Sequence, residues 1–169
     1  MSKKELIKLA LTVSNGAVMN EIDKMSDAAT TFPTPSGGCH PLWVLGHLTL
    51  VEGLVPEVLY GEKNPAANWW ALFGENSEAL ADPEAYPAFA EVRARYQQLR
   101  ERNLQILESL KEEDLDRPVK APPKGREHEF ATFGSSFLVL ALHQCMHRSH
   151  ATDALRAAGR VQTAVPAGN

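Results

Sequence analysis

The chain has 169 residues, of which 44% are hydrophobic and 22% charged, and its formal net charge at pH 7 is -4; this length suits one core and predicts a single domain, residues 1–169. Acidic and basic residues are interspersed, so the sequence has neither the basic stripe of a nucleic-acid-binding protein nor the cationic amphipathic face of a membrane-bound one. The N-terminus lacks the apolar core of a signal peptide and no apolar run reaches the length of a membrane span, so we expect a cytoplasmic protein.

The N-terminal segment has the pattern of an amphipathic helix. Ser2 followed by Glu5 resembles a capping box, and apolar residues then recur at helical spacing as far as Met25. We expect this first helix to end near residues 27–31. Two prolines and two glycines follow within residues 31–38, which indicates a turn-rich connection.

A second helix is predicted to begin at Pro41, because proline is tolerated in the first turn of a helix and apolar residues continue at helical spacing to Val55. Pro56 is expected to end or kink it. The connection over residues 60–87 has little periodicity. Connections of this length tend to be functional or disordered, and its aromatic cluster argues against disorder: Trp69, Trp70 and Phe73.

The C-terminal half predicts two more helices. Apolar residues alternate steps of three and four from residue 89 to residue 110, whereas residues 111–131 are rich in proline and charge and indicate a loop. Thr132 is expected to cap a last helix, which Gly159 closes. Four helices without strand patterns predict an all-α fold, a four-helix bundle with long crossover connections.

Three of the six histidines lie in the last helix. At 100° per residue, His143, His147 and His150 share one stripe, which is also the apolar face, so their imidazoles are expected to point into the protein. Two histidines four apart can bind one metal ion together. Cys145 lies on the opposite side of the helix and is interpreted as a packed thiol rather than a further ligand.

A third ligand is expected from another helix of the bundle. His47 lies in the apolar stripe of the second helix, whereas His40 at its start is interpreted as a cap or a surface residue and His128 as solvated. A single buried histidine is often just a hydrogen-bonded core residue. Several on facing core surfaces carry a large desolvation cost, which a bound metal compensates. Spacing alone leaves both readings open.

A family resemblance rests on four segments: WVLGHL at 43–48, WWALFG at 69–74, EEDLDRP at 112–118 and HQCMHRSHATDALRAAGR at 143–160. These segments resemble the DinB/YfiT-like family of four-helix-bundle metalloenzymes. The resemblance implies a metal site formed by His47, His143 and His147. Many members have glycine and glutamine where this chain has Ser149 and His150. His150 is therefore expected to hydrogen-bond a ligand in place of the glutamine, with competition against His143 as the alternative.

Three neutral imidazoles leave a coordination position open, as in catalytic zinc sites. We expect one divalent metal, zinc or nickel. Characterised members of the family include transferases and isomerases that use small thiols such as bacillithiol or mycothiol, so the resemblance implies a thiol-dependent S-transferase or isomerase acting on a small-molecule electrophile. The alternative is a non-catalytic bundle that binds a metal or another ligand. The aromatic cluster is expected either to cover the site or, preferably, to anchor its own loop, and a homodimer is left open.

Overall fold

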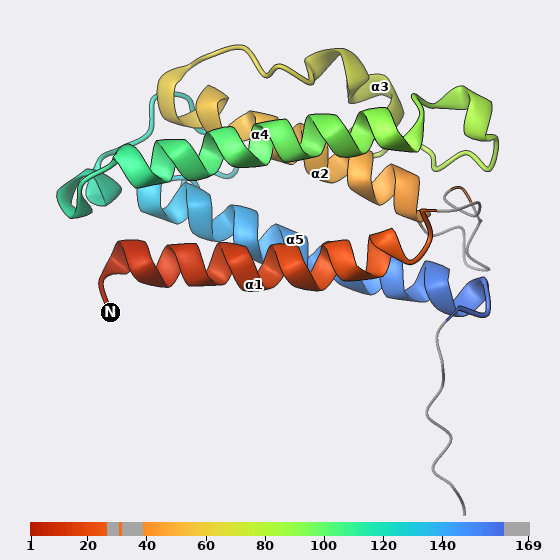
Figure 1. Cartoon of the computed structure of the whole chain (residues 1–169). Helices are drawn as coiled ribbons and strands as arrows, with labels where there is room; N and C mark the ends of the chain where they lie inside the picture. The colour runs from red at the N-terminus through yellow and green to blue at the C-terminus, as the bar shows by residue number, and fades with distance from the viewer. Residues whose placement is uncertain (27–30, 32–38, 161–169) are drawn as a thin grey trace, which may run out of the picture.

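The computed structural model describes residues 1–26, 31 and 39–160, and within them the secondary structure is helical (Figure 1). The one pairing of extended backbone among these residues is an isolated bridge between Pro118 and Thr132. The all-α prediction is therefore confirmed. The helices are α1 (Lys3–Asp23), α2 (Pro41–Tyr60), η1 (Ala67–Trp69), α3 (Trp70–Phe73), η2 (Pro83–Ala85), α4 (Phe89–Ser109), η3 (Glu112–Asp116) and α5 (Phe133–Ala157).

The four long helices lie lengthwise beside one another. Helices α1 and α5 pack together and run in the same direction, whereas α2 and α4 form a second pair that runs the opposite way (Figure 1). Helix α2 also packs against α5, and the histidines project from these two helices. The connection from α2 to α4 travels back along the molecule, which is why these two helices are parallel (Figure 1).

The helix starts follow the sequence signals. The Ser2 hydroxyl accepts from the Glu5 amide while the Glu5 carboxylate accepts from the Ser2 amide, so the first capping box is confirmed. Thr132 caps α5 as predicted, with Ser135 as its reciprocal partner. His40 caps α2, because its Nδ1 accepts from the Trp43 amide at 3.0 Å. His40 was predicted to be a cap or a surface residue, and the cap is confirmed; its imidazole is buried, which rules out the surface alternative.

Two helix ends differ from the prediction. Helix α1 ends at Asp23, earlier than expected, and residues 27–30 lie outside the described part of the chain. Helix α2 continues through Pro56 to Tyr60. Pro56 has no N–H to donate to the Glu52 carbonyl one turn before it, and the side chain of Asn103 on α4 donates to that carbonyl instead, at 2.9 Å. Gly61 caps the end of the helix, and its φ of 71° suits glycine.

The core consists of two apolar clusters. One contains residues such as Val18, Leu45 and Phe73, and the other contains residues such as Leu11, Val55 and Phe137. On each long helix, the positions between the two clusters carry a buried polar residue: Ser14, Glu52, Arg100, Asn103 and Gln144. A polar layer therefore crosses the core at the level of the histidines on α5.

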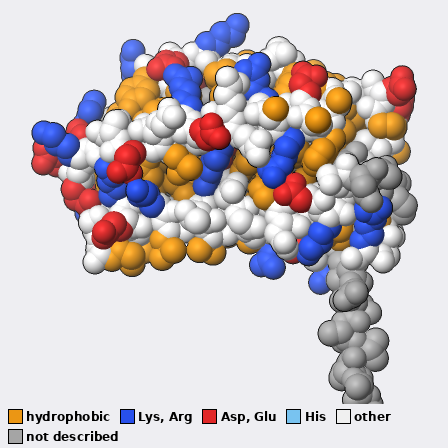
Figure 2. All heavy atoms as spheres, viewed as in Figure 1, with side chains coloured by type: hydrophobic (Ala, Val, Ile, Leu, Met, Phe, Trp, Pro, Cys, Tyr) orange, Lys and Arg blue, Asp and Glu red, His pale blue; other side chains and the backbone are white. Residues whose placement is uncertain are grey.

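The apolar character of α2 reflects its central position. By length and composition α2 could cross a membrane, contrary to the expectation that no such segment is present, but 78% of its most apolar stretch is buried against the rest of the protein. That burial is typical of a core helix. On the face that α1 and α4 present, acidic and basic side chains are interspersed rather than separated by sign (Figure 2).

Candidate metal centre

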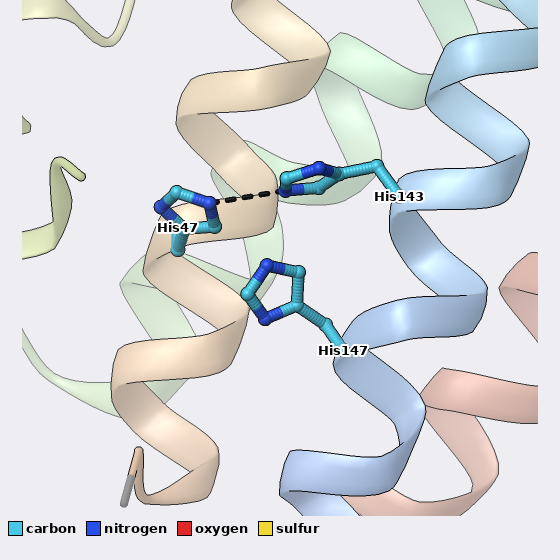
Figure 3. Close-up of side chains that lie close together, drawn as sticks. All are labelled: His47, His143 and His147. Atoms are coloured by element: carbon cyan, nitrogen blue, oxygen red, sulfur yellow. Dashed lines mark hydrogen bonds between the residues drawn. The ribbon is translucent and has the colours of Figure 1, made fainter.

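His47 from α2 faces His143 and His147, which lie on successive turns of α5 (Figure 3). The Nε2 atoms of His47 and His143 are 3.0 Å apart. Each of the three imidazoles places one ring nitrogen within 4.8 Å of the other two. The structure thus brings together the three residues that the resemblance selected, and it does so between two helices that are far apart in the sequence.

The imidazole of His47 is held from both sides. Its Nδ1 lies 2.7 Å from the Phe73 carbonyl oxygen at the end of α3, and its ring stacks on the indole of Trp43 with ring centroids 4.9 Å apart and planes 7° from parallel. The Trp43 indole N–H donates to the Ser77 hydroxyl at 2.8 Å. Gly46 allows this arrangement, because a Cβ there would lie 2.3 Å from the Phe73 ring.

His150 contacts the group from outside. Its Nδ1 lies 3.2 Å from the Nδ1 of His147, and its side chain is exposed, so the expectation that it points into the protein was wrong. The part of the α5 histidine stripe that carries His150 is exposed to solvent. His150 does not belong to the group of three whose nitrogens converge. Its placement is that of a hydrogen-bond partner to His147.

The geometry fits a metal ion. Because the Phe73 carbonyl can only accept, Nδ1 of His47 carries the proton and Nε2 presents a lone pair. When Nδ1 of His147 donates to Nδ1 of His150, the Nε2 of His147 also presents a lone pair. Two nitrogens bound tetrahedrally at 2.0–2.1 Å to one zinc ion lie about 3.3 Å apart, so the observed 3.0 Å between His47 and His143 needs only a small adjustment.

Electrostatics keep these imidazoles neutral. Burial, together with the neighbouring imidazoles, lowers the pKa of His143 to about 4 and that of His147 to about 2. Burial also lowers the pKa of His47, although the Phe73 carbonyl opposes that shift. A histidine binds a metal only when it is neutral. All three histidines therefore stay able to bind a metal below the pH at which free imidazole becomes protonated.

The remaining candidates lie elsewhere. Cys145 is exposed, so its interpretation as a packed thiol was wrong; the face of α5 opposite the histidines meets solvent there. His128 is exposed, as expected.

The aromatic cluster anchors its own loop. Trp69 is buried and packs edge-to-face on Phe73, whereas Trp70 is half exposed. The loop reaches the site through the Phe73 carbonyl rather than through an indole.

Sequence reasoning missed the buried polar layer beside the site. The Glu52 carboxylate accepts from Arg100 at 3.1 Å, from Gln144 at 2.9 Å and from Asn103 at 2.7 Å. The Gln144 amide oxygen accepts from Ser14 at 2.7 Å, so the network joins all four long helices. A charged residue in an apolar helical stripe, such as Glu52, was the available signal. Gln144 is next to His143 in the chain. The network that holds Gln144 therefore also fixes the position of His143 along the length of the molecule.

A sequence profile of the DinB superfamily matches residues 11–151, well over half of the chain and including all three histidines. The chain belongs to the DinB superfamily. Members of this superfamily bind metals, which agrees with the three-histidine group of this DinB-superfamily protein. No curated protein matches the chain.

Proposed function

We propose that this DinB-superfamily protein is a divalent-metal-dependent enzyme, a thiol S-transferase or isomerase, with His47, His143 and His147 as ligands of zinc or nickel. One observation carries the proposal: three neutral imidazoles converge, while their outer nitrogens at His47 and His147 have partners of their own. Histidine ligands fixed in this way are typical of metal sites.

The protein contributes position and shielding. Stacking of Trp43 covers one face of His47, and the Phe73 carbonyl sets the direction of its Nε2. A metal with three histidine ligands supplies an open position at which a coordinated thiol or water loses its proton near neutral pH. The described side chains include no carboxylate in the converging group, so a site of this kind is neutral before the metal adds its charge.

The reacting thiol is proposed to come from solution. Burial raises the pKa of the Cys39 thiol, which keeps it protonated and unreactive. Cys145 lies on the exposed face of α5, away from the histidines. Neither cysteine belongs to the converging group. A small cellular thiol such as bacillithiol or mycothiol is therefore the proposed co-substrate, and a small electrophile its partner.

A thiol panel tests the proposal. Bacillithiol, mycothiol, glutathione, cysteine and coenzyme A are each incubated with monobromobimane and zinc- or nickel-loaded protein, and the rate of conjugate formation is compared with that of His47→Ala. We expect metal-dependent acceleration with at least one thiol and none with the variant, while His128→Ala retains the full rate. The absence of acceleration with every thiol, despite bound metal, would favour the non-catalytic metal- or ligand-binding bundle.

We also propose that the four long helices form a four-helix bundle with long crossover connections and that residues 1–169 make one domain. The packing of α1 with α5 and of α2 with both α4 and α5 supports this classification. A cytoplasmic location, without nucleic-acid or membrane partners, fits the mixed surface charge (Figure 2). A homodimer is part of the proposal that light scattering of the purified protein tests.

A further inference from the structure

Large hydrophobic side chains that meet solvent are concentrated on the paired helices α1 and α5. Ten such residues occur in the described part of the chain, with exposed fractions of at least 37%. Six of the ten lie on these two helices: Leu6, Leu9, Val13, Leu138, Leu142 and Met146. Single exposed hydrophobic residues are common on proteins, whereas a contiguous group of them marks an interaction surface.

The six side chains form one surface. On each helix they are spaced three or four residues apart, so they follow a single side of that helix. Leu6 of α1 and Leu138 of α5 line the same hollow of about 230 Å³ between the two helices. A row of hydrophobic side chains lies along the lower edge of the molecule, beneath α1 (Figure 2). We call this surface the α1/α5 face.

The α1/α5 face lacks the charges that normally cover the solvent side of a helix. No Asp, Glu, Lys or Arg occurs in residues 9–20 of α1 or in residues 133–147 of α5. A helix that binds an anionic lipid surface carries basic residues beside its apolar ones, and these segments have none. The composition therefore favours another protein surface as the partner.

Val13 and Leu142 mark the same height on the two helices. The Ser14 hydroxyl donates to the Gln144 side chain at 2.7 Å, and Val13 and Leu142 come just before these residues on helices that run in the same direction. Both lie on the α1/α5 face, and 61% and 65% of their surfaces are exposed. They therefore form the middle of the surface.

The apolar pattern is symmetric about this middle. On α5, Leu138 and Met146 lie four residues before and after Leu142, and on α1 a leucine and an alanine flank Val13 in the same way. A twofold axis at this height, perpendicular to the helices, would set apolar side chains of one copy against apolar side chains of another. Contacts of a surface with itself about a twofold axis are the commonest kind in oligomers.

The size of the α1/α5 face suits the core of such a contact. Fifteen helical residues span about 22 Å, and two adjacent helices with their side chains are about 20 Å wide, which gives roughly 450 Å². An interface of standard size buries about 800 Å² per partner, as an apolar core within a polar rim. The α1/α5 face thus supplies more than half of that area before its polar surroundings are counted.

We propose that the α1/α5 face is the interface of a homodimer, in which two copies pack antiparallel about a twofold axis that passes beside Leu142. Leu138 of each copy then lies opposite Met146 of the other. This inference rests on the homodimer of the proposed function, for which it names the surface. It requires neither the metal nor the thiol chemistry.

Sedimentation velocity of the full-length protein over a range of concentrations tests the interface, once with metal and once after chelation. We expect a dimer in both forms. Leu142→Glu and Leu142→Lys should each raise the Kd of the dimer at least roughly 100-fold, because like charges then meet at the axis. A one-to-one mixture of the two variants should associate at least roughly tenfold more tightly than either alone, since opposite charges meet instead.

Leu104→Glu is the matched control. Leu104 is a leucine on α4 with 37% of its surface exposed, outside the α1/α5 face, so its replacement should leave the Kd unchanged. Because Leu142 is itself exposed, Leu142→Glu should keep the helical circular dichroism and the Tm of the monomer.

Cys145 reports the location of the contact. It is an exposed thiol three residues after Leu142 on α5. Maleimide labelling of Cys145, followed by mass spectrometry of its peptide, should slow several-fold at concentrations at which the dimer forms. In Leu142→Glu the labelling rate should be the same at all concentrations.

The inference is overturned if the native protein is a monomer at all concentrations, or if Leu142→Glu and Leu104→Glu have the same effect on the Kd. A dimer that leaves Cys145 unprotected, that forms only with metal, or whose two charge variants do not associate when mixed would also contradict it. Failure of the proposed chemistry is a separate result. A protein without thiol-transfer activity would still form this dimer after chelation.

Discussion

At the scale of single residues, His150 shows how a position outside the converging group can act on it. Its Nδ1 meets the Nδ1 of His147 at 3.2 Å, which directs the Nε2 of His147 towards the other two imidazoles. Hydrogen-bond partners of this kind fix the tautomer and orientation of a ligand. His150 therefore orients His147, whereas the Phe73 carbonyl both orients His47 and, because it can only accept, fixes its tautomer.

His150→Ala should weaken metal binding about 10- to 100-fold without abolishing it, because the three ligands remain while His147 loses its partner. Competition titration with a chromophoric chelator measures the change. Ser149→Ala is the control, since that hydroxyl donates only within its own helix, to the Met146 carbonyl. Complete loss of metal, as expected for His143→Ala, would make His150 a ligand, and an unchanged affinity would remove it from the site.

The stability of the metal-free protein should depend on pH through the same histidines. An unfolded histidine has a pKa near 6.5, whereas the folded values for His143 and His147 are about 4 and about 2. Below pH 6.5 the unfolded chain therefore takes up protons that the folded chain does not. The free energy of unfolding should be highest above pH 6.5 and should fall as the pH decreases towards 4.

Urea unfolding of the chelated protein between pH 7.5 and pH 5.5 measures this dependence. His143→Gln should flatten it, because one titrating group is removed, while His128→Ala should leave it unchanged since that side chain is exposed. A flat profile for the native sequence, or an equal effect of the two substitutions, would show that burial does not hold these imidazoles neutral.

At the scale of secondary-structure elements, the buried network around Glu52 sets how the helices lie against one another. Burial raises the pKa of Glu52, and the Arg100 guanidinium acts against that shift. The network connects α2 with α4 and α5 and, through Gln144 and Ser14, with α1. It lies between the two apolar clusters, which could otherwise tolerate sliding of one helix along another.

Glu52→Ala should lower the free energy of unfolding by about 3–5 kcal/mol, because the buried Arg100 then lacks its counterion. Chemical denaturation of the metal-free protein measures the loss directly. Glu101→Ala, an exposed position on α4, should change the free energy of unfolding by less than about 0.5 kcal/mol. Equal and small effects at both positions would mean that the network adds nothing to the stability of the fold.

This network also shows which features of the fold could not be predicted from local sequence patterns. Apolar periodicity and caps at Ser2 and Thr132 are local signals, and they located the starts of α1 and α5 correctly. The continuation of α2 through Pro56 depends on Asn103, 47 positions later, whose amide takes the place of the missing donor. No local pattern contains that partner. The role of the Phe73 carbonyl at His47 is non-local in the same way.

The residues of the candidate site also differ in how far local sequence patterns predict them. His143 and His147 follow from spacing, since residues four apart share a helix face. His47 was one candidate by its apolar setting, and the family resemblance selected it. The outward turn of His150 was unpredicted, because helix periodicity gives the position of a residue on a stripe and not the width of the surface that a neighbouring helix covers.

At the scale of the whole molecule, metal binding should stabilise the packing of α2 against α5, which lie far apart in the sequence. Its ligands come from α2 and α5, so the site does not exist until these helices have packed. A ligand that binds only the folded state stabilises it, by about 2.7 kcal/mol when its free concentration is about 100 times Kd. Chelation should therefore lower the Tm of the native protein at pH 7 and leave that of His47→Ala unchanged. A Tm that chelation does not alter, after confirmed removal of the metal, would contradict this coupling.

Metal analysis of the protein, expressed without a histidine tag and dialysed against metal-free buffer, tests the central claim most directly. Inductively coupled plasma mass spectrometry should find one zinc or nickel ion per chain in the native protein and in His128→Ala. His47→Ala, His143→Ala and His147→Ala should each contain little or none while remaining folded by circular dichroism. Full occupancy in any of these three variants, or a native protein that binds no divalent metal even after incubation with zinc and nickel, would contradict the three-histidine metal centre.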